Sequence, residues 1–238
     1  LMNAKVLVIG AGGLGSPLLL YLAAAGLGTI GIIDDDKVEL SNLQRQIIHK
    51  TNKIGVHKTD SAKETILSIN PNINIITYKE RFSISNAEKI ISKYDIVADG
   101  SDNFGTRFLA NDVCFLSKTT LVSAAILRFE GQISTYTAYK DSNCCYRCLW
   151  PEPPPKGLIA SCGEAGVFGA LAGSIGSIQA IEVLKEILGI GKSLNNFLLI
   201  FDTLSSEMRK IKINKDNKCQ LCGTKPTITS IKKHKDYL

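Results

Sequence analysis

A glycine-rich loop between a predicted strand and a predicted helix is the feature that most constrains the fold. Residues 5–9 (Lys-Val-Leu-Val-Ile) form a short apolar run typical of a buried parallel strand. Residues 16–25 then favour a helix, with Pro17 in its first turn and Gly26 as its C-terminal cap. The glycines of the loop between them are Gly10, Gly12, Gly13 and Gly15. This unit gathers backbone N–H groups and the positive end of a helix dipole at one point, which suits a phosphate.

A second predicted strand ends in a carboxylate that suits a ribose. Residues 29–33 (Thr-Ile-Gly-Ile-Ile) are apolar and mostly β-branched, and Asp34 follows them directly. An acidic side chain at this place accepts hydrogen bonds from ribose hydroxyls. On their own, these residues indicate a phosphate and a ribose, which is also the pattern of a nicotinamide or flavin dehydrogenase.

The segment after the second strand carries a polar block that an ordinary dehydrogenase loop does not need. It consists of Asn42, Gln44, Arg45 and Gln46, with Lys58 further along the chain at the start of a helix predicted to end at Asn70. A planar guanidinium and an ammonium together suit a polyphosphate chain. A solvated basic turn is the alternative, but the amides beside a phosphate loop favour a binding site.

A third polar cluster follows another predicted strand. Residues 95–99 (Asp-Ile-Val-Ala-Asp) favour a strand, and Asp102 and Asn103 follow at the edge of the sheet where ligands bind in open α/β folds. Two hard oxygen donors, Asp99 and Asp102, suit Mg²⁺ beside a triphosphate. The same residues also fit an Asp-capped helix over 103–117, and both interpretations can hold.

Cysteine spacing indicates a metal site. Four of the seven cysteines form two Cys-x-x-Cys pairs, which are Cys145 with Cys148 and Cys219 with Cys222. Two such pairs make a tetrahedral zinc site, although buried or disulfide-linked cysteines remain open at this point. Cys144 is adjacent to the first pair, so the sequence does not decide which two thiols of this segment bind the metal. Cys114 lies within a predicted helix and is expected in the core.

Composition fits one α/β domain over residues 1–238 and excludes two partner classes. The net charge of +6 is modest and the cations are scattered without stacking aromatic residues, so nucleic acid is not expected. The longest apolar stretch, residues 165–188, contains Glu182, Lys185 and Glu186, which argues against a membrane span. No secretory signal precedes the first strand, so a cytoplasmic protein with reduced thiols is expected.

Together these motifs resemble the ThiF/MoeB/HesA adenylyltransferases, which are relatives of the ubiquitin-activating enzymes. The similarity runs from residue 5 to about residue 223 and rests on the motifs above, together with Gly55, Arg107 and the run Glu130-Gly-Gln132. The fold expected is a Rossmann-like α/β fold, with a mixed sheet that is mostly parallel, an antiparallel extension and helices on both faces. The later strands are predicted at residues 120–125, 132–137, 197–201 and 208–213.

The resemblance implies ATP-dependent adenylylation of a ubiquitin-like sulfur carrier protein that ends in Gly-Gly. The carrier would be ThiS- or MoaD-like and would feed thiamine or molybdopterin synthesis. By analogy, Asp34 holds the ribose and Asp102 holds Mg²⁺. The phosphates would be held by Asn42, Arg45 and Lys58, and the glycine loop and Asn103 would also belong to the ATP-binding residues. The resemblance also implies a homodimer, structural zinc and an antiparallel sheet extension on which the carrier lies.

Two further expectations follow from the resemblance. Cys162, in the Gly-flanked run before the long apolar helix, is either a sulfur-transfer thiol or a merely packed or exposed cysteine. Related enzymes carry a helical segment before the first strand that sends an arginine to the partner subunit. Here the first strand begins near residue 1 and Leu1 precedes Met2, so we expect the printed chain to lack that segment.

Two other functions compete with adenylylation. An NAD(P)-dependent oxidoreductase would bind nicotinamide and release no pyrophosphate, but the sequence shows no proton donor near the glycine loop, since its histidines are at positions 49, 57 and 234. A non-catalytic zinc scaffold would dock a carrier without ATP. An enzyme that activates a peptide or an amino acid is also compatible with the motifs.

Overall fold

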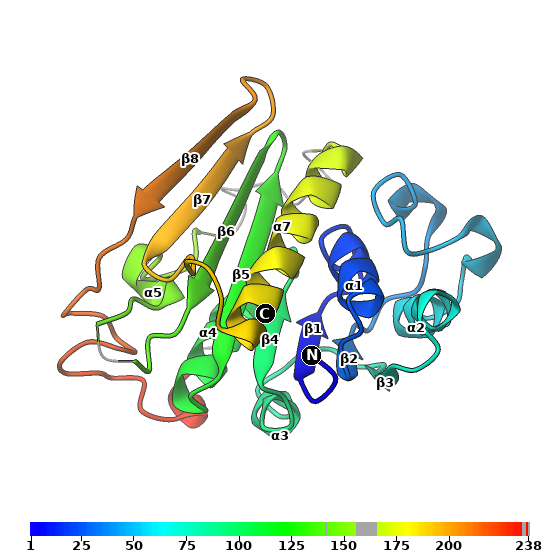
Figure 1. The fold of residues 1–238 in the computed structure, drawn as a ribbon. Helices are drawn as coiled ribbons and strands as arrows, with labels where there is room; N and C mark the ends of the chain where they lie inside the picture. Colours follow the sequence, from blue (N-terminus) through cyan, green and yellow to red (C-terminus); the bar gives the residue numbers. More distant parts are fainter. Residues whose placement is uncertain (141, 156–165, 235–236, 238) are drawn as a thin grey trace.

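An eight-stranded mixed sheet runs through the molecule in the order β3-β2-β1-β4-β5-β6-β7-β8 (Figure 1). Neighbours from β3 to β5 are parallel, and β6, β7 and β8 are added antiparallel. The strands are β1 (Lys5–Ile9), β2 (Thr29–Ile33), β3 (Asn74–Tyr78), β4 (Ile96–Asp99), β5 (Thr120–Leu127), β6 (Glu130–Tyr136), β7 (Phe197–Asp202) and β8 (Glu207–Lys212). The computed structural model describes residues 1–140, 142–155, 166–234 and 237, and the predicted thiol Cys162 lies outside them.

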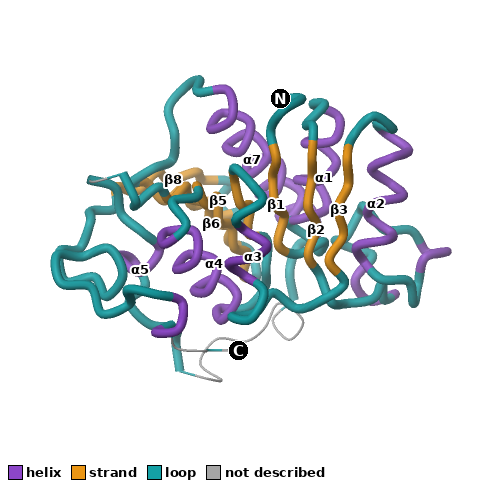
Figure 2. The backbone as a smooth tube through the Cα atoms, turned by 90° about the horizontal axis from the view of Figure 1, so that it is seen from below, coloured by secondary structure: helices purple, strands orange, loops and turns teal. Residues whose placement is uncertain are grey.

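Helices cover both faces of this sheet, as the sequence predicts. The helices are α1 (Gly15–Ala24), α2 (Lys58–Ile69), α3 (Ala87–Ile91), α4 (Phe104–Leu116), α5 (Tyr146–Leu149) and α7 (Gly169–Leu188). One apolar core joins alternate residues of β1 and β2 to α1, α2 and α7. A second core joins the opposite residues of the same strands to α3, α4 and α5, which group on the other face (Figure 2). Because both faces are covered, the central strands are apolar on both sides.

The strand order reverses at β1, and this places the site. β1 pairs with β2 on one side and with β4 on the other. The loops that leave β1 and β4 therefore diverge to opposite faces and leave a crevice at the carboxyl ends of the strands. The glycine loop and the Ser101–Asn103 segment meet at this crevice.

Helix α7 packs unusually close to the glycine loop because small residues face it. A Cβ at Gly176 would lie 2.3 Å from the carbonyl oxygen of Leu14, and one at Gly13 would lie 3.2 Å from Ala172 Cβ. At the start of the helix, a Cβ at Gly169 would lie 2.3 Å from the Gln44 carbonyl oxygen. The small residues that the sequence shows in this stretch therefore seat α7 against the loop and the polar block, rather than against lipid.

A buried ion cluster ties α4 to α5 and to His234. Arg147 Nε and Nη2 donate to the two carboxylate oxygens of Asp112 at 2.7 and 2.8 Å. His234 Nδ1 lies 2.7 Å from Asp112 Oδ2, and the guanidinium lies 4.7 Å from the ring centroid of Phe108. The side chains of Arg147, Asp112 and His234 are at most 1% exposed. This cluster links three parts of the chain that are distant in sequence.

Most predicted elements are confirmed, and the differences have local causes. The strands at 5–9 and 29–33 have the predicted bounds, and the antiparallel extension is present. The long apolar helix begins at Gly169, because Phe168 directly before it has extended backbone angles (φ −68°, ψ 120°). Helix α4 is capped by Asn103, whose Oδ1 accepts from the Thr106 N–H at 2.8 Å, and not by the preceding aspartate. Within the described residues, no helix combines the length and apolar character that crossing a bilayer requires.

Candidate active site

A large cavity opens at the crevice where the strand order reverses. It has a volume of about 1340 Å³ and is bounded by the ends of β1, β2 and β4 on one side and by β5 and β6 on the other. Residues of the predicted site that line it include Gly10, Gly12, Gly13, Asp34, Asn42, Arg45, Lys58, Asp102 and Asn103. The structure thus brings three sequence motifs to one cavity.

The glycine loop presents backbone donors to this cavity. Gly10 has a φ of +90°, which only glycine adopts readily, and a Cβ at Gly15 would lie 2.0 Å from the Gly10 carbonyl oxygen. Within the described part of the chain, the N–H groups of Gly12 and Gly13 make no hydrogen bond. Unpaired N–H groups at the start of α1 are the donors that an anion binds at a helix N-terminus.

Asp34 is fixed by the backbone around it. Its Oδ2 accepts from the Ala11 N–H at 2.8 Å, and its Oδ1 accepts from the Asp36 N–H at 2.9 Å. Burial raises the pKa of Asp34, and the nearby Lys58 ammonium and the two N–H groups partly offset that rise. The carboxylate therefore has a set orientation at the cavity wall, and its remaining lone pairs can accept from a ribose.

The polar block after β2 is organised around one amide. Asn42 Oδ1 accepts from Arg45 Nη2 and from Gln46 Nε2, both at 3.1 Å. Arg45 Nη1 also donates to the Ser41 carbonyl at 3.3 Å. Asn42 therefore orients the guanidinium that faces the cavity, which is a role that its sequence position alone does not reveal.

Lys58 is held at the cavity by an exposed partner. Its Nζ lies 2.7 Å from Asp36 Oδ2, and the lysine side chain is 7% exposed whereas that of the aspartate is 66% exposed. A buried cation that faces an exposed carboxylate can exchange that partner for a more highly charged ligand. Lys58 and Arg45 thus supply two positive charges to the same cavity.

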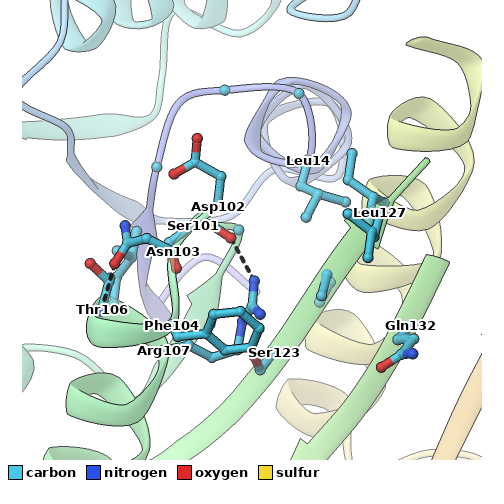
Figure 3. A pocket seen from close by; sticks show the side chains of 18 of the residues that line it. Leu14, Ser101, Asp102, Asn103, Phe104, Thr106, Arg107, Ser123, Leu127 and Gln132 are labelled. Carbon is cyan, nitrogen blue, oxygen red and sulfur yellow. Dashed lines mark hydrogen bonds between the residues drawn. The ribbon is translucent and has the colours of Figure 1, made fainter. Parts of the chain in front are cut away.

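Of the two aspartates predicted near a metal, one faces the cavity and the other is structural. Asp99 is fully buried and accepts from the Ser101 N–H at 3.0 Å and from Ser123 Oγ at 2.9 Å. Asp102 is exposed and lines the cavity, and no hydrogen bond or ion pair joins its carboxylate to a described residue. Figure 3 shows Asp102 pointing away from α4, towards the loop that enters α1 at Leu14.

Arg107 braces the segment that carries Asp102. Its Nη2 donates to the Ser101 carbonyl at 2.8 Å, as the dashed line in Figure 3 shows. Its Nε lies 3.7 Å from Asp99 Oδ2. Asp99, Arg107 and the cap at Asn103 therefore fix the backbone on both sides of Asp102.

The cavity continues beyond the residues that are predicted to bind the nucleotide. Its far part is lined by Arg128, Phe129, Gln132, Trp150 and Glu152, with Pro154 and Pro155 beside them. These two prolines belong to the proline-rich run 151–157, of which the structure describes the residues up to 155. The cavity volume exceeds the roughly 300–1,000 Å³ of typical small-molecule sites, so it has room for a second reactant beside a nucleotide.

The four paired cysteines form a separate cluster away from the cavity. The Sγ–Sγ distances are 3.6 Å between Cys145 and Cys219, 3.3 Å between Cys148 and Cys222, and 4.0 Å between Cys145 and Cys148. All four thiols are free, so the disulfide alternative is wrong for them. Zn–S bonds of about 2.3 Å in a tetrahedron place sulfurs about 3.8 Å apart, so the cluster can hold such an ion.

The comparison with known protein families decides the assignment. Residues 1–222 match the family described as the ThiF family. The chain belongs to the ThiF family. This membership and the names of its relatives indicate an adenylyltransferase, and the predicted family resemblance is confirmed.

Two relatives illustrate how much of a family member the chain spans. It is 44% identical to a sulfur carrier protein adenylyltransferase of Thermus thermophilus, over 95% of this chain and 85% of that protein. It is 49% identical to a probable adenylyltransferase/sulfurtransferase MoeZ of Mycobacterium tuberculosis, over 91% of this chain and 56% of that protein. The chain thus spans most of the first relative and little more than half of the second.

A solved structure shows the same fold. A crystal structure of E. coli MccB with MccA-N7isoASN matches with a TM-score of 0.83 and 21% identity, covering 94% of this chain and 68% of that chain. At this level of identity the match shows the fold alone and carries no conclusion about the substrate.

Sequence reasoning missed a buried residue that contacts the glycine loop from outside the cavity lining. His49 is only 6% exposed, and its Nε2 lies 2.8 Å from the Ala11 carbonyl oxygen inside the glycine loop. The expectation that no histidine stands near the loop is therefore wrong. His49 follows the polar block by only three residues. Because the polar block is predicted to lie beside the glycine loop, this short spacing is the signal that could have placed His49 near the loop.

Proposed function

We propose that the chain adenylylates the C-terminal glycine of a ubiquitin-like sulfur carrier protein with ATP. The observation that carries this proposal is one cavity that joins the unpaired N–H groups of Gly12 and Gly13 to Arg45, Lys58 and the exposed Asp102. Two cations and a carboxylate without a partner among the described residues fit a triphosphate with its divalent ion better than the diphosphate bridge of NAD. The family and the names of the relatives support the same reaction.

The reaction needs charge neutralisation more than it needs a protein nucleophile. An oxygen of the carrier's terminal carboxylate attacks the α-phosphorus of ATP, and the bond from that phosphorus to the β-bridging oxygen breaks. Pyrophosphate leaves with the electron pair, and the products are an acyl adenylate and pyrophosphate. Because both reactants are anions, Arg45 and Lys58 lower their repulsion and stabilise the charge on the leaving group.

Each site residue has a role in this scheme that its geometry supports. Asp34 binds the ribose hydroxyls. The glycine loop and Asn103 bind phosphate oxygens, while Asn42 holds Arg45 in place. Lys58 exchanges Asp36 for the phosphates when ATP enters. Asp102 would hold Mg²⁺, which would supply further charge neutralisation at the leaving pyrophosphate.

The far part of the cavity receives the carrier's extended Gly-Gly tail. Glycines suit this part of the cavity, which Phe129 and Trp150 line, because a tail without side chains needs little room to reach the α-phosphate. The carrier itself lies on the antiparallel part of the sheet and serves thiamine or molybdopterin synthesis. We also propose that the enzyme acts as a homodimer in the cytoplasm, and that its cysteine cluster holds structural zinc.

The competing functions have less support. An oxidoreductase has no use for Arg45, Lys58 and Asp102 in one cavity, and the named relatives are adenylyltransferases. A scaffold that only docks a carrier would not need the cavity at all. An activator of another peptide shares the chemistry, so the choice of acceptor is what the experiment must test.

We expect Mg²⁺-ATP to bind and NAD not to compete. Isothermal titration calorimetry with each nucleotide measures this directly, because the two cations and Asp102 match a triphosphate. Pyrophosphate–ATP exchange should then appear only when a ThiS- or MoaD-like carrier is added. A carrier that lacks its last glycine is the matched control and should give no exchange. Tight NAD binding without ATP binding would contradict the proposal, as would exchange that ignores the carrier's C-terminus.

We expect protein purified without chelator to contain about one zinc ion per chain, bound by four thiolates. Cys222→Ser should lose the metal and destabilise the region around residues 145–148 and 219–222, because a closed structural site contributes folding energy. Pyrophosphate exchange per folded molecule should change little. Cys114→Ala, at a buried cysteine outside the cluster, should retain the metal. Metal analysis that finds no zinc in the unaltered protein would refute the assignment.

A further inference from the structure

His49 makes two hydrogen bonds that connect the glycine loop to helix α2. Its Nε2 lies 2.8 Å from the Ala11 carbonyl oxygen, and its Nδ1 lies 2.9 Å from Ser61 Oγ. All three residues are buried, with exposed fractions of 6% for His49, 2% for Ser61 and 0% for Ala11. The contacts are therefore shielded from water. If one of these hydrogen bonds is lost, no water molecule can replace it.

The partners determine the tautomer of the ring. A carbonyl oxygen only accepts, so Nε2 of His49 must carry the hydrogen in this contact. Nδ1 of the neutral ring is then an acceptor, and the Ser61 hydroxyl donates to it. Burial lowers the pKa of His49 and the nearby Lys58 ammonium lowers it further, while the Ala11 carbonyl opposes both. The neutral ring with hydrogen on Nε2 is thus the form that this environment favours.

Ala11 is held from both sides by side chains of other segments. Its N–H donates to Asp34 Oδ2 at 2.8 Å, and its carbonyl accepts from His49. Glycines flank it at positions 10 and 12, and glycine restrains the backbone less than any other residue. A loop of this composition needs ties from outside if it is to keep one conformation before a ligand arrives.

We propose that His49 is a positioning residue that sets the glycine loop for ATP. With Ser61 behind it, the ring fixes the Ala11 carbonyl and so aims the N–H groups of Gly12 and Gly13 at the cavity. His49 is absent from the cavity lining, so it acts through the loop and touches no reacting atom. This inference rests on the proposed function, because it takes the ligand of the loop to be ATP.

The test compares three variants in carrier-dependent pyrophosphate exchange. His49→Leu removes the donor, and its KM for ATP should rise about tenfold, as expected for the loss of one well-formed buried hydrogen bond. The KM for the carrier should stay within about twofold, because the tail contacts other walls of the cavity. His49→Gln places an amide donor near the same position and should restore the KM for ATP to within about threefold of the unaltered protein. Ser61→Ala removes only the hydrogen bond between Ser61 and His49. Its KM for ATP should lie between those of His49→Leu and His49→Gln.

The outcomes separate this inference from the proposed function. If the unaltered protein shows no ATP-dependent exchange, the proposed function fails first. If it is active but His49→Leu leaves the KM for ATP unchanged, or raises both KM values equally, the positioning role is overturned. A thermal melt of each variant reports whether it is folded.

A second measurement needs no variant. Long-range ¹H–¹⁵N spectra of the histidine-labelled protein should show His49 neutral, with hydrogen on Nε2, near pH 6.5, where a free histidine is about half protonated. Hydrogen on Nδ1 alone would overturn the proposal even if His49→Leu failed to fold, because Nε2 could then not donate to the Ala11 carbonyl.

Discussion

Replacing Asp102 with alanine is expected to slow pyrophosphate exchange by about 100-fold or more. The carboxylate faces the cavity beside the glycine loop and makes no hydrogen bond or ion pair with a described residue. In the proposed function this carboxylate would hold Mg²⁺, so its loss should remove the ion's positive charge from the leaving pyrophosphate. The substitution should cost little folding energy. Steady-state exchange measured with saturating carrier and increasing Mg²⁺-ATP will give the effect on kcat and on KM separately.

Two further substitutions make this result specific. Asp102→Asn retains the shape of the side chain but removes its charge, and it should be nearly as slow as the alanine variant. Glu88→Gln makes the same change at an exposed carboxylate of α3 outside the cavity, and it should be unaffected. Near-normal exchange by Asp102→Ala with a normal melting curve would mean that the metal or the phosphates are held elsewhere.

Asp112→Asn is expected to lower the free energy of unfolding by about 3–5 kcal/mol, because it leaves a buried guanidinium without its counter-charge. Both carboxylate oxygens of Asp112 accept from Arg147, and one also contacts His234. All three side chains are buried, so water cannot replace the lost partner. Urea unfolding followed by circular dichroism, at a fixed zinc concentration, measures the change.

An exposed ion pair provides the comparison. Asp60 Oδ2 lies 2.8 Å from Lys79 Nζ, and the two side chains are 40% and 47% exposed. Asp60→Asn should therefore cost less than about 1 kcal/mol, because solvent screens the pair. Equal losses in the two variants would show that the Asp112 cluster contributes no more than a surface contact.

The parts of the fold that the sequence predicts well are those with strong local signals. The apolar runs before Gly10 and Asp34 have the bounds of β1 and β2, because each is ended by a residue that cannot continue a buried strand. Strand β3 carries no comparable signal. It is an edge strand of five residues, of which only one is buried, so its pattern is not distinctive.

The site shows the same division between local and tertiary information. The chemistry of Arg45, Lys58 and Asp102 follows from residue type and from position after a strand, and the structure brings them to one cavity. The geometry of Asn42 and the tie of His49 to Ala11 depend on how separate segments pack. The spacing of residues along a chain carries no record of such a contact. Similarly, the sequence does not distinguish Asp99 from Asp102. Only the packing of the fold buries Asp99 and leaves Asp102 exposed at the cavity.

Strand β8 ends the sheet, and its composition has a consequence for solubility. Within the described residues it pairs only with β7, so one row of backbone donors and acceptors lies open. An open edge is a template on which a strand of another copy can add and start aggregation. All six residues of β8 are exposed, and they include three cations and one anion, placed so that both faces carry charge. A second copy would bring the same excess of positive charge to this edge, so mutual repulsion should keep neighbouring molecules apart at high concentration.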